Sequence, residues 1–226
     1  MCYSAFSVEI AGRTVEVLNL AGLFNQKKQK QDSDEVKLSW SQRLVVDFHD
    51  LVHVLAVFML VYILLFRVVV VVGPSMYHTL VDGDRLLLVS NVLYRNPKQG
   101  DVIVASKESF RDGECIIKRV IATEGQTVDI DFQLGVVYVD GVALQEDYTY
   151  TMTNMEEGMK FPATVPEGCV FAMGDNRNNS TDSRNPQIGF IDKREILGKA
   201  VFLMVPGTHG DTEEAQYDRI GSEVLH

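Results

Sequence analysis

The sequence VVVVVGPSMYHTL occupies residues 68–80 and decides how the rest of the chain is interpreted. Five consecutive valines favour an extended strand, because the two heavy atoms on each Cβ suit a pleated backbone. Gly73 and Pro74 then end the strand, since proline lacks a ladder N–H and glycine permits unusual backbone angles. Ser75 is therefore predicted to stand on a turn at a strand end. Turns are rich in serine, so a serine that merely ends the strand is the alternative for this stretch alone.

An apolar run precedes the valines. Residues 51–66 contain only His53 and Tyr62 as polar interruptions. These 16 residues fall slightly short of the ~20 that a helix needs to cross the hydrocarbon of a bilayer, and the flanking residues supply the rest. We therefore predict a transmembrane helix over residues 44–67, with a buried globular helix as the alternative. A cleaved signal peptide is not expected, because the run begins deep in the chain and no small-residue cleavage pattern follows it.

The charges that flank this run predict its orientation. Five basic side chains come before it and two follow closely: Lys27, Lys28, Lys30, Lys37 and Arg43 before, Arg67 and Arg85 after. By the positive-inside rule, residues 1–43 remain in the cytoplasm and residues 68–226 lie outside. The polar residues 26–35, QKKQKQDSDE, read as a linker, so the N-terminal segment is expected to be partly disordered. Within this segment, apolar and polar residues alternate loosely from Val8 to Leu20. This pattern suggests a small hairpin around Gly12-Arg13.

Residues 68–226 read as a mainly β domain built from antiparallel strands. Apolar and β-branched stretches alternate with turn signals at residues 85–90, 101–106, 116–123, 126–131, 135–139, 169–173 and 198–205. Asp140-Gly141, between two apolar stretches, is a strong two-residue hairpin signal. No helical periodicity longer than two turns appears after the apolar run. The fold class is therefore an N-terminal transmembrane helix followed by an antiparallel β domain.

Charge and cysteine content exclude several functions. The net charge of −10 arises wholly after residue 67, because the first 67 residues carry seven acidic and seven basic side chains. An acidic domain without a basic patch does not favour a nucleic-acid partner. Three scattered cysteines make neither a disulfide scaffold nor a zinc site, and no metal or other cofactor is expected. Cys115 and Cys169 are expected either to pair outside the cell or to remain buried free thiols.

The strand at residues 116–121, IIKRVI, carries two cations. Alternation places Lys118 on one face and Arg119 on the other, and a strand this apolar must bury at least one face. Burial lowers the pKa of a lysine from about 10.4, by as much as ~3–5 units. A neutral amine is a general base, which a serine needs to become a nucleophile. An exposed or paired lysine at a sheet edge is the alternative.

The polar stretch at residues 174–184, GDNRNNSTDSR, follows an apolar strand and predicts a loop rich in side-chain hydrogen bonds to its own backbone. A calcium loop of the EF-hand type starting at Asp175 would need glycine at Ser180 and glutamate at Pro186, and neither is present. No Ser-His-Asp set is available either, since His78 lies too close to Ser75 along an extended turn. The remaining histidines lie in or beside the apolar run or in the C-terminal tail. Lys118 is therefore the candidate base.

Taken in order, the apolar run, Gly-Pro-Ser-Met, Lys-Arg-Val-Ile and the polar stretch resemble the bacterial type I signal peptidases. The resemblance covers about residues 51–221, and its G-D-N-R-x-x-S-x-D-S-R element is highly specific. It implies the β-sheet fold of that family and a membrane-bound serine endopeptidase that removes signal peptides from exported preproteins. It also implies attachment to the bacterial cytoplasmic membrane by one span, with the catalytic domain outside. The lipid bilayer and the protein-export translocon are then the partners to consider.

The resemblance also implies roles for individual residues. Ser75 would be the nucleophile, Lys118 the general base, and Ser180 the hydroxyl that hydrogen-bonds and orients the lysine. Asp182 and Arg184 would pair to hold the loop. Gly73 and Met76 flank the nucleophile as supporting residues; relatives with a hydroxyl at the glycine position gain a donor that this chain lacks. Val71 and Ile117 are candidates for shallow pockets that accept small substrate side chains.

One departure and two alternatives stay open. The family usually has proline where this chain has His78, which frees a backbone N–H close to the nucleophile. A related Ser/Lys peptidase with one dedicated substrate would carry the same motifs. A catalytically dead β module that binds extended segments is the non-enzymatic alternative, and His78 is its only support.

Overall fold

A computed structural model describes residues 7–10, 13–16, 39–107, 109–110, 113–208 and 216–225. Near the N-terminus, strands β1 (Ser7–Ile10) and β2 (Arg13–Glu16) pair antiparallel. This pairing confirms the predicted hairpin. The predicted polar linker at residues 26–35, and with it the expected disorder, lies outside the described residues.

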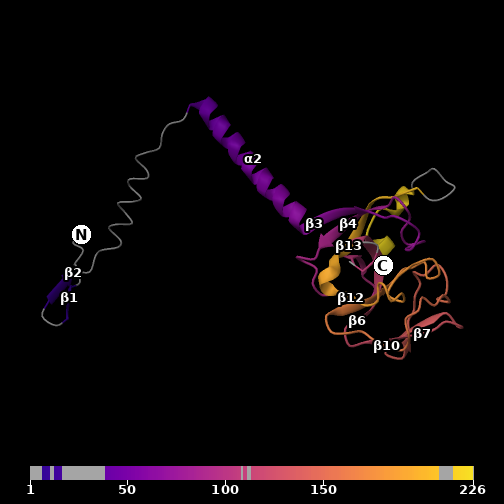
Figure 1. Ribbon diagram of the computed structural model, residues 1–226. Coiled ribbons are helices and arrows are strands. Elements are labelled where there is room, and N and C mark those ends of the chain that lie inside the picture. Colours follow the sequence, from indigo (N-terminus) through magenta and orange to yellow (C-terminus); the bar gives the residue numbers. More distant parts are fainter. Residues whose placement is uncertain are drawn as a thin grey trace. The chain divides into compact units, whose positions relative to one another are not determined.

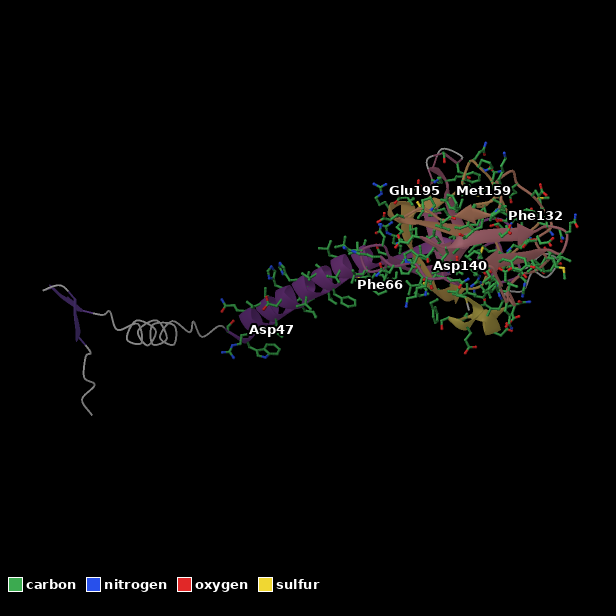
Figure 2. All side chains as sticks on the ribbon, turned by 90° about the horizontal axis from the view of Figure 1, so that it is seen from below. Asp47, Phe66, Phe132, Asp140, Met159 and Glu195 are labelled. Atoms are coloured by element: carbon green, nitrogen blue, oxygen red, sulfur yellow. The ribbon has the colours of Figure 1, made fainter. Side chains whose placement is uncertain are left out.

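Helix α2 (Trp40–Leu65) begins four residues before the predicted start of the transmembrane helix and ends two residues before its predicted end, because Phe66 and Arg67 pair in a sheet strand. A capping box explains that start, because Ser39 Oγ accepts from the Gln42 N–H at 3.4 Å and Gln42 Oε1 accepts from the Ser39 N–H at 2.9 Å. Its side chains are exposed along the whole helix, as Figure 2 shows around Asp47. Among the described residues, α2 is the one helix long and apolar enough to cross a membrane.

Strand β3 follows α2 directly, contains the first three valines of the polyvaline run, and joins a seven-stranded antiparallel sheet (Figure 1). The order in that sheet is β12-β11-β6-β5-β13-β4-β3. The bounds of its strands are β3 Phe66–Val70, β4 Arg85–Ser90, β5 Val102–Ser106, β6 Cys115–Thr123, β11 Cys169–Met173, β12 Ile191–Asp192 and β13 Ile196–Val205. Strand β6, which carries both cations, therefore lies inside the sheet and not at its edge.

A second, four-stranded antiparallel sheet has the order β10-β7-β8-β9. Its strands are β7 Thr127–Asp131, β8 Val136–Val139, β9 Val142–Ala143 and β10 Ala163–Thr164. The predicted hairpin joins β8 to β9, and Asp140 and Gly141 both have positive φ, 52° and 78°, as a tight primed turn requires. In Figure 1, β3, β4 and β13 lie at one end of the β domain, and β7 and β10 lie at the other.

Short helices complete the described β domain. They are the 3-10 turns η2 (Lys193–Glu195), η3 (Tyr217–Arg219) and η4 (Glu223–Leu225). As predicted, no α-helix follows α2 in the described part of the chain. All seven predicted strands form, with boundaries shifted by no more than two residues. The two-residue strands β10 and β12 have no counterpart in the prediction, because two residues show no periodicity, whereas β9 is the second strand of the predicted hairpin.

The buried apolar side chains of the described residues form three clusters, and β6 contributes to all of them. Ile117 packs on the first, Ile116 and Val120 belong to the second, and Ile121 belongs to the third. Because both faces of this strand are covered, both of its cations are buried. The prediction required only one buried face.

Cys115 and Cys169 are both free thiols in the structure. Cys115 is exposed at the start of β6, and Cys169 is half-buried at the start of β11. The expectation of a buried thiol is therefore wrong for Cys115.

Candidate active site

The turn that carries Ser75 is fixed from both sides. Gly73 has a φ of +82°, and its N–H donates to Asp82 Oδ1 at 2.7 Å. On the far side, Met76 and Leu80 are 1% and 0% exposed within the first apolar cluster. Ser75 itself is half-buried between these anchors. The glycine conformation and the buried methionine thus hold the hydroxyl in place at the strand end.

Lys118 reaches this hydroxyl from the interior strand β6. Its Nζ lies 2.8 Å from Ser75 Oγ and 2.9 Å from the carbonyl oxygen of Ile117. Only 4% of the residue is exposed, and within the described part of the chain it forms no ion pair. Burial lowers the pKa of Lys118 to about 8, against the opposing effect of nearby carboxylates. The amine is thus available as a base near neutral pH.

Arg119, the next residue, is buried in a different way. It is 1% exposed, and its Nε and Nη2 donate to the two carboxylate oxygens of Asp175 at 2.9 and 2.7 Å. Its Nη1 donates to the carbonyls of Gly100 and Leu225, each at 2.9 Å. A guanidinium with this set of acceptors keeps its charge when buried. Arg119 is therefore structural, in contrast to Lys118.

The polar loop at residues 174–184 closes over the site. Arg184 binds Asp182 with two hydrogen bonds of 2.8 Å, from Nε and from Nη2, as predicted. Asp182 Oδ2 also accepts from Ser180 Oγ at 3.0 Å and from the Gly174 N–H at 3.0 Å. The structure differs from the prediction at Ser180, which bonds to Asp182 and forms no hydrogen bond with Lys118.

Gly174 and Asn176 join this loop to the turn that carries Ser75. A Cβ on Gly174 would lie 2.2 Å from Ser180 Oγ and 2.4 Å from the Ser75 carbonyl oxygen. Asn176 donates from its backbone to the Ser75 carbonyl and from its side chain to the Pro74 carbonyl, each at 3.1 Å. The loop and the Ser75 turn are thus in van der Waals contact and hydrogen-bonded.

A cleft of about 540 Å³ opens beside the serine and the lysine. Residues 69–76 line one side, residues 114–118 another, and residues 179–181 a third. Val71 and Ile117 both line it, where the sequence predicts shallow pockets. His78 lies outside this lining; it is exposed, with its ring centroid 6.3 Å from that of Tyr150.

The sequence does not single out two residues that the structure brings to the site. Asn176 lies within the polar loop, but no pattern predicts its contact with Pro74. Glu157 lies in an irregular stretch and contacts Asp182 and Arg184. Both contacts join segments far apart in the sequence, so a single sequence carries no signal for them. Among the described residues, no group of three or more metal-ligating side chains is present.

Several known signal peptidases are similar to this chain. The chain is 40% identical over 144 residues to a probable signal peptidase I-1 of Synechocystis sp., covering 60% of this chain and 69% of that protein. It is 31% identical over 192 residues to signal peptidase I T of Bacillus subtilis, covering 80% of this chain and 92% of that protein. A crystal structure of a signal peptidase I from Enterococcus faecalis matches with a TM-score of 0.37 at 30% identity, covering 46% of this chain and 96% of that one. Residues 45–205 match the family described as signal peptidase, peptidase S26. Since this match spans well over half of the sequence, the chain belongs to the signal peptidase family, peptidase S26.

Proposed function

We propose that Ser75 and Lys118 are the catalytic dyad with which this signal peptidase cleaves signal peptides from exported preproteins. The observation that carries the proposal is the 2.8 Å contact between Ser75 Oγ and the buried Nζ of Lys118. A binding module without catalysis would have no need of an amine buried without an ion pair at this position. The contact therefore favours a peptidase over a module that only binds extended segments.

The reaction starts from the free amine of Lys118. The amine accepts the Ser75 proton as Oγ attacks the carbonyl carbon of the scissile bond. The resulting ammonium then donates this proton to the leaving amine, and water releases the acyl group from Ser75 in the second half of the reaction. With a pKa of about 8, roughly a tenth of the lysine is free base at pH 7.

The oxyanion is stabilised by backbone donors. We assign the Ser75 N–H to this role, because Gly73 supplies no hydroxyl at the position where some relatives have one. Met76 supports the turn from the core, and Ser180, Asp182 and Arg184 support it through the loop. In this proposal Ser180 acts through Asp182, to which it is bonded, and not by a direct contact with Lys118.

The substrate binds as an extended peptide in the cleft. Residues 69–70 of β3 and residues 115–117 of β6 present strand backbone to the cleft, which suits main-chain hydrogen bonds to an added strand. Val71 and Ile117 line the cleft near the dyad. Their branched side chains leave shallow pockets, so small residues before the cleavage point are favoured.

Membrane attachment follows from α2. We propose that residues 44–65 span the cytoplasmic membrane of a bacterium once, with residues 1–43 inside and the catalytic domain, residues 68–226, outside. From Arg67 to Ser75 is eight residues, at most about 26–29 Å of extended chain, which keeps the serine near the bilayer surface. Preproteins reach that surface through the export translocon, and we place the enzyme beside it.

A processing assay tests this function. Detergent-solubilised protein is incubated with a secretory precursor, and the new N-terminus is sequenced. Cleavage after a small residue, with a second small residue two positions earlier, is expected. Ser75→Ala should abolish cleavage and leave the fold intact, since a half-buried hydroxyl on a turn contributes little to stability. Cleavage by the alanine variant would show that another residue is the nucleophile.

A further inference from the structure

Glu157 is an acidic side chain buried next to the loop that covers the dyad. It lies two residues before Met159, which is labelled in Figure 2. Its side chain is 9% exposed, and Oε1 lies 3.2 Å from Arg184 Nη2. Its Oε2 accepts from the Asp182 N–H at 3.4 Å. Glu157 therefore joins the charged cluster of Asp182 and Arg184.

Arg184 offers Glu157 little compensation, because both N–H groups of Nη2, the nitrogen 3.2 Å from Glu157, already have acceptors. Nε and Nη2 bind the two oxygens of Asp182, Nη2 also contacts the Arg177 carbonyl at 2.6 Å, and Nη1 donates to the Met155 carbonyl. Within the described residues, Glu157 Oε1 receives no hydrogen bond. A buried carboxylate in this position is costly to ionise. Burial and the neighbouring Asp182 raise the pKa of Glu157 to about 7.

Four charged side chains act on Lys118 from the surrounding elements. Asp182 and Arg184 belong to the polar loop, Asp175 begins it, and Glu157 comes from the stretch between β9 and β10. Asp175 is paired with Arg119, and Asp182 with Arg184. The remaining contacts of the amine, Ser75 Oγ and the Ile117 carbonyl, are uncharged. Glu157 is thus the acid of this set without a guanidinium of its own.

We propose that Glu157 is a positioning residue that sets the pH range in which Lys118 is a free base. The inference rests on the proposed role of Lys118 as general base. An ionised Glu157 favours the ammonium form of the lysine, so the enzyme needs a higher pH to generate its base. Protonation of Glu157 removes this negative charge, and with it the stabilisation of the ammonium form. Because the pKa of Glu157, about 7, lies below the pKa of Lys118, about 8, the carboxylate is mostly ionised where the amine loses its proton.

The test compares Glu157→Gln with its exposed neighbour Glu156→Gln as the matched control. Removing the Glu157 charge should move the acid limb of the kcat/KM–pH profile to lower pH by roughly 0.5–1 unit. Glu156→Gln should leave the profile unchanged. Glu157→Asp, which keeps the charge, should retain a limb close to that of the wild type. An acid limb that stays in place in Glu157→Gln, or moves to higher pH, would overturn the proposal.

A second readout does not depend on catalysis. In a Ser75→Ala background, acetylation of Lys118 by acetic anhydride is followed against pH by mass spectrometry. Glu157→Gln should lower the midpoint of this labelling by the same amount as it moves the limb. If Glu157→Gln shows no unfolding transition on heating, and so is not folded, Glu157→Ala is used instead. It removes the same charge and must lower the labelling midpoint of Lys118 by the same amount.

The two proposals fail in different ways. An unmoved labelling midpoint in a folded Glu157 variant, with normal cleavage by the wild type, contradicts the role of Glu157 alone. Cleavage by a Lys118→Arg variant contradicts the dyad itself.

Discussion

At the scale of single residues, Lys118 and Arg119 show that the hydrogen-bond acceptors around a buried cation determine its role. Both are almost fully buried on one strand. Arg119 has two carboxylate oxygens and two carbonyls as acceptors, so its charge is compensated. Lys118 has a hydroxyl and one carbonyl, so burial acts against its charge. Reciprocal substitutions at these two positions therefore separate a chemical role from a structural one.

Lys118→Arg is expected to yield a folded, inactive protein. A guanidinium with a pKa above ~12 cannot accept the serine proton at any working pH. The measurement is kcat/KM for a preprotein from pH 6 to 10, a trial range. Wild-type activity should fall as the pH drops through the Lys118 pKa of about 8, because protonation removes the base. The arginine variant should be inactive across the whole range.

Arg119→Lys is the matched control for that variant. An ammonium cannot reproduce the fork to Asp175 together with both carbonyl contacts, so a lower unfolding temperature is expected. Below that temperature the variant should keep its activity and its acid limb. Activity in Lys118→Arg would rule out the lysine as base and return it to a purely structural role.

At the scale of elements, the loop at residues 174–184 is held by buried charges and not by regular structure. Arg184 pairs with Asp182 inside the loop, while Arg177 reaches out to Glu146 and Asp175 to Arg119. Asn176 ties the loop to the nucleophile turn. Each of these groups would be costly to bury without its partner. The loop therefore has one well-defined position against Ser75.

Gly174→Ala should disrupt that position. The added Cβ would overlap Ser180 Oγ and the Ser75 carbonyl oxygen. The serine side chain can rotate away, but the carbonyl belongs to the backbone and cannot move without shifting the Ser75 turn. A displacement of about 1 Å near the reacting atoms can cost on the order of 10²-fold in rate. We therefore expect at least that loss in kcat/KM, measured at a temperature where the variant is folded.

Gly198→Ala supplies the control for this prediction. Its Cβ would overlap the Val89 carbonyl oxygen at 2.3 Å, a similar clash on β13 against β4. It should lower the unfolding temperature without a comparable loss of rate in the folded protein. Full activity of folded Gly174→Ala would mean that the loop need not contact the nucleophile turn for catalysis.

The same elements show what a sequence can predict and where it stops. The strands β4 and β11 form over the predicted residues, because a short apolar run between turn signals is a local feature of the sequence. The contact of Ser75 with Lys118 joins residues 43 positions apart, and its prediction relied on the elimination of the histidines as bases together with a family resemblance. The Ser180 hydroxyl, predicted to bind Lys118, instead binds Asp182, which is two residues away and buried with it.

At the scale of the whole molecule, the proposal places the two parts of the chain on opposite sides of a membrane. Of the basic side chains that flank the apolar run, five precede it and two follow closely, and the net charge of −10 arises wholly after residue 67. Positive charges near a span resist translocation, so the N-terminal part should stay inside. Two cysteines report on the two sides: Cys2 belongs to the N-terminal part, and Cys115 is exposed on β6.

Thiol labelling of a Cys169→Ser variant tests this topology. A membrane-impermeant maleimide added to intact spheroplasts should label Cys115, because the β domain faces outward. Cys2 should react only after lysis, when the reagent reaches the cytoplasmic side. Single Cys2→Ser and Cys115→Ser variants assign the two signals. Labelling of Cys2 in intact spheroplasts, with Cys115 protected until lysis, would reverse the orientation and place the dyad on the side where signal peptides have not yet been exported.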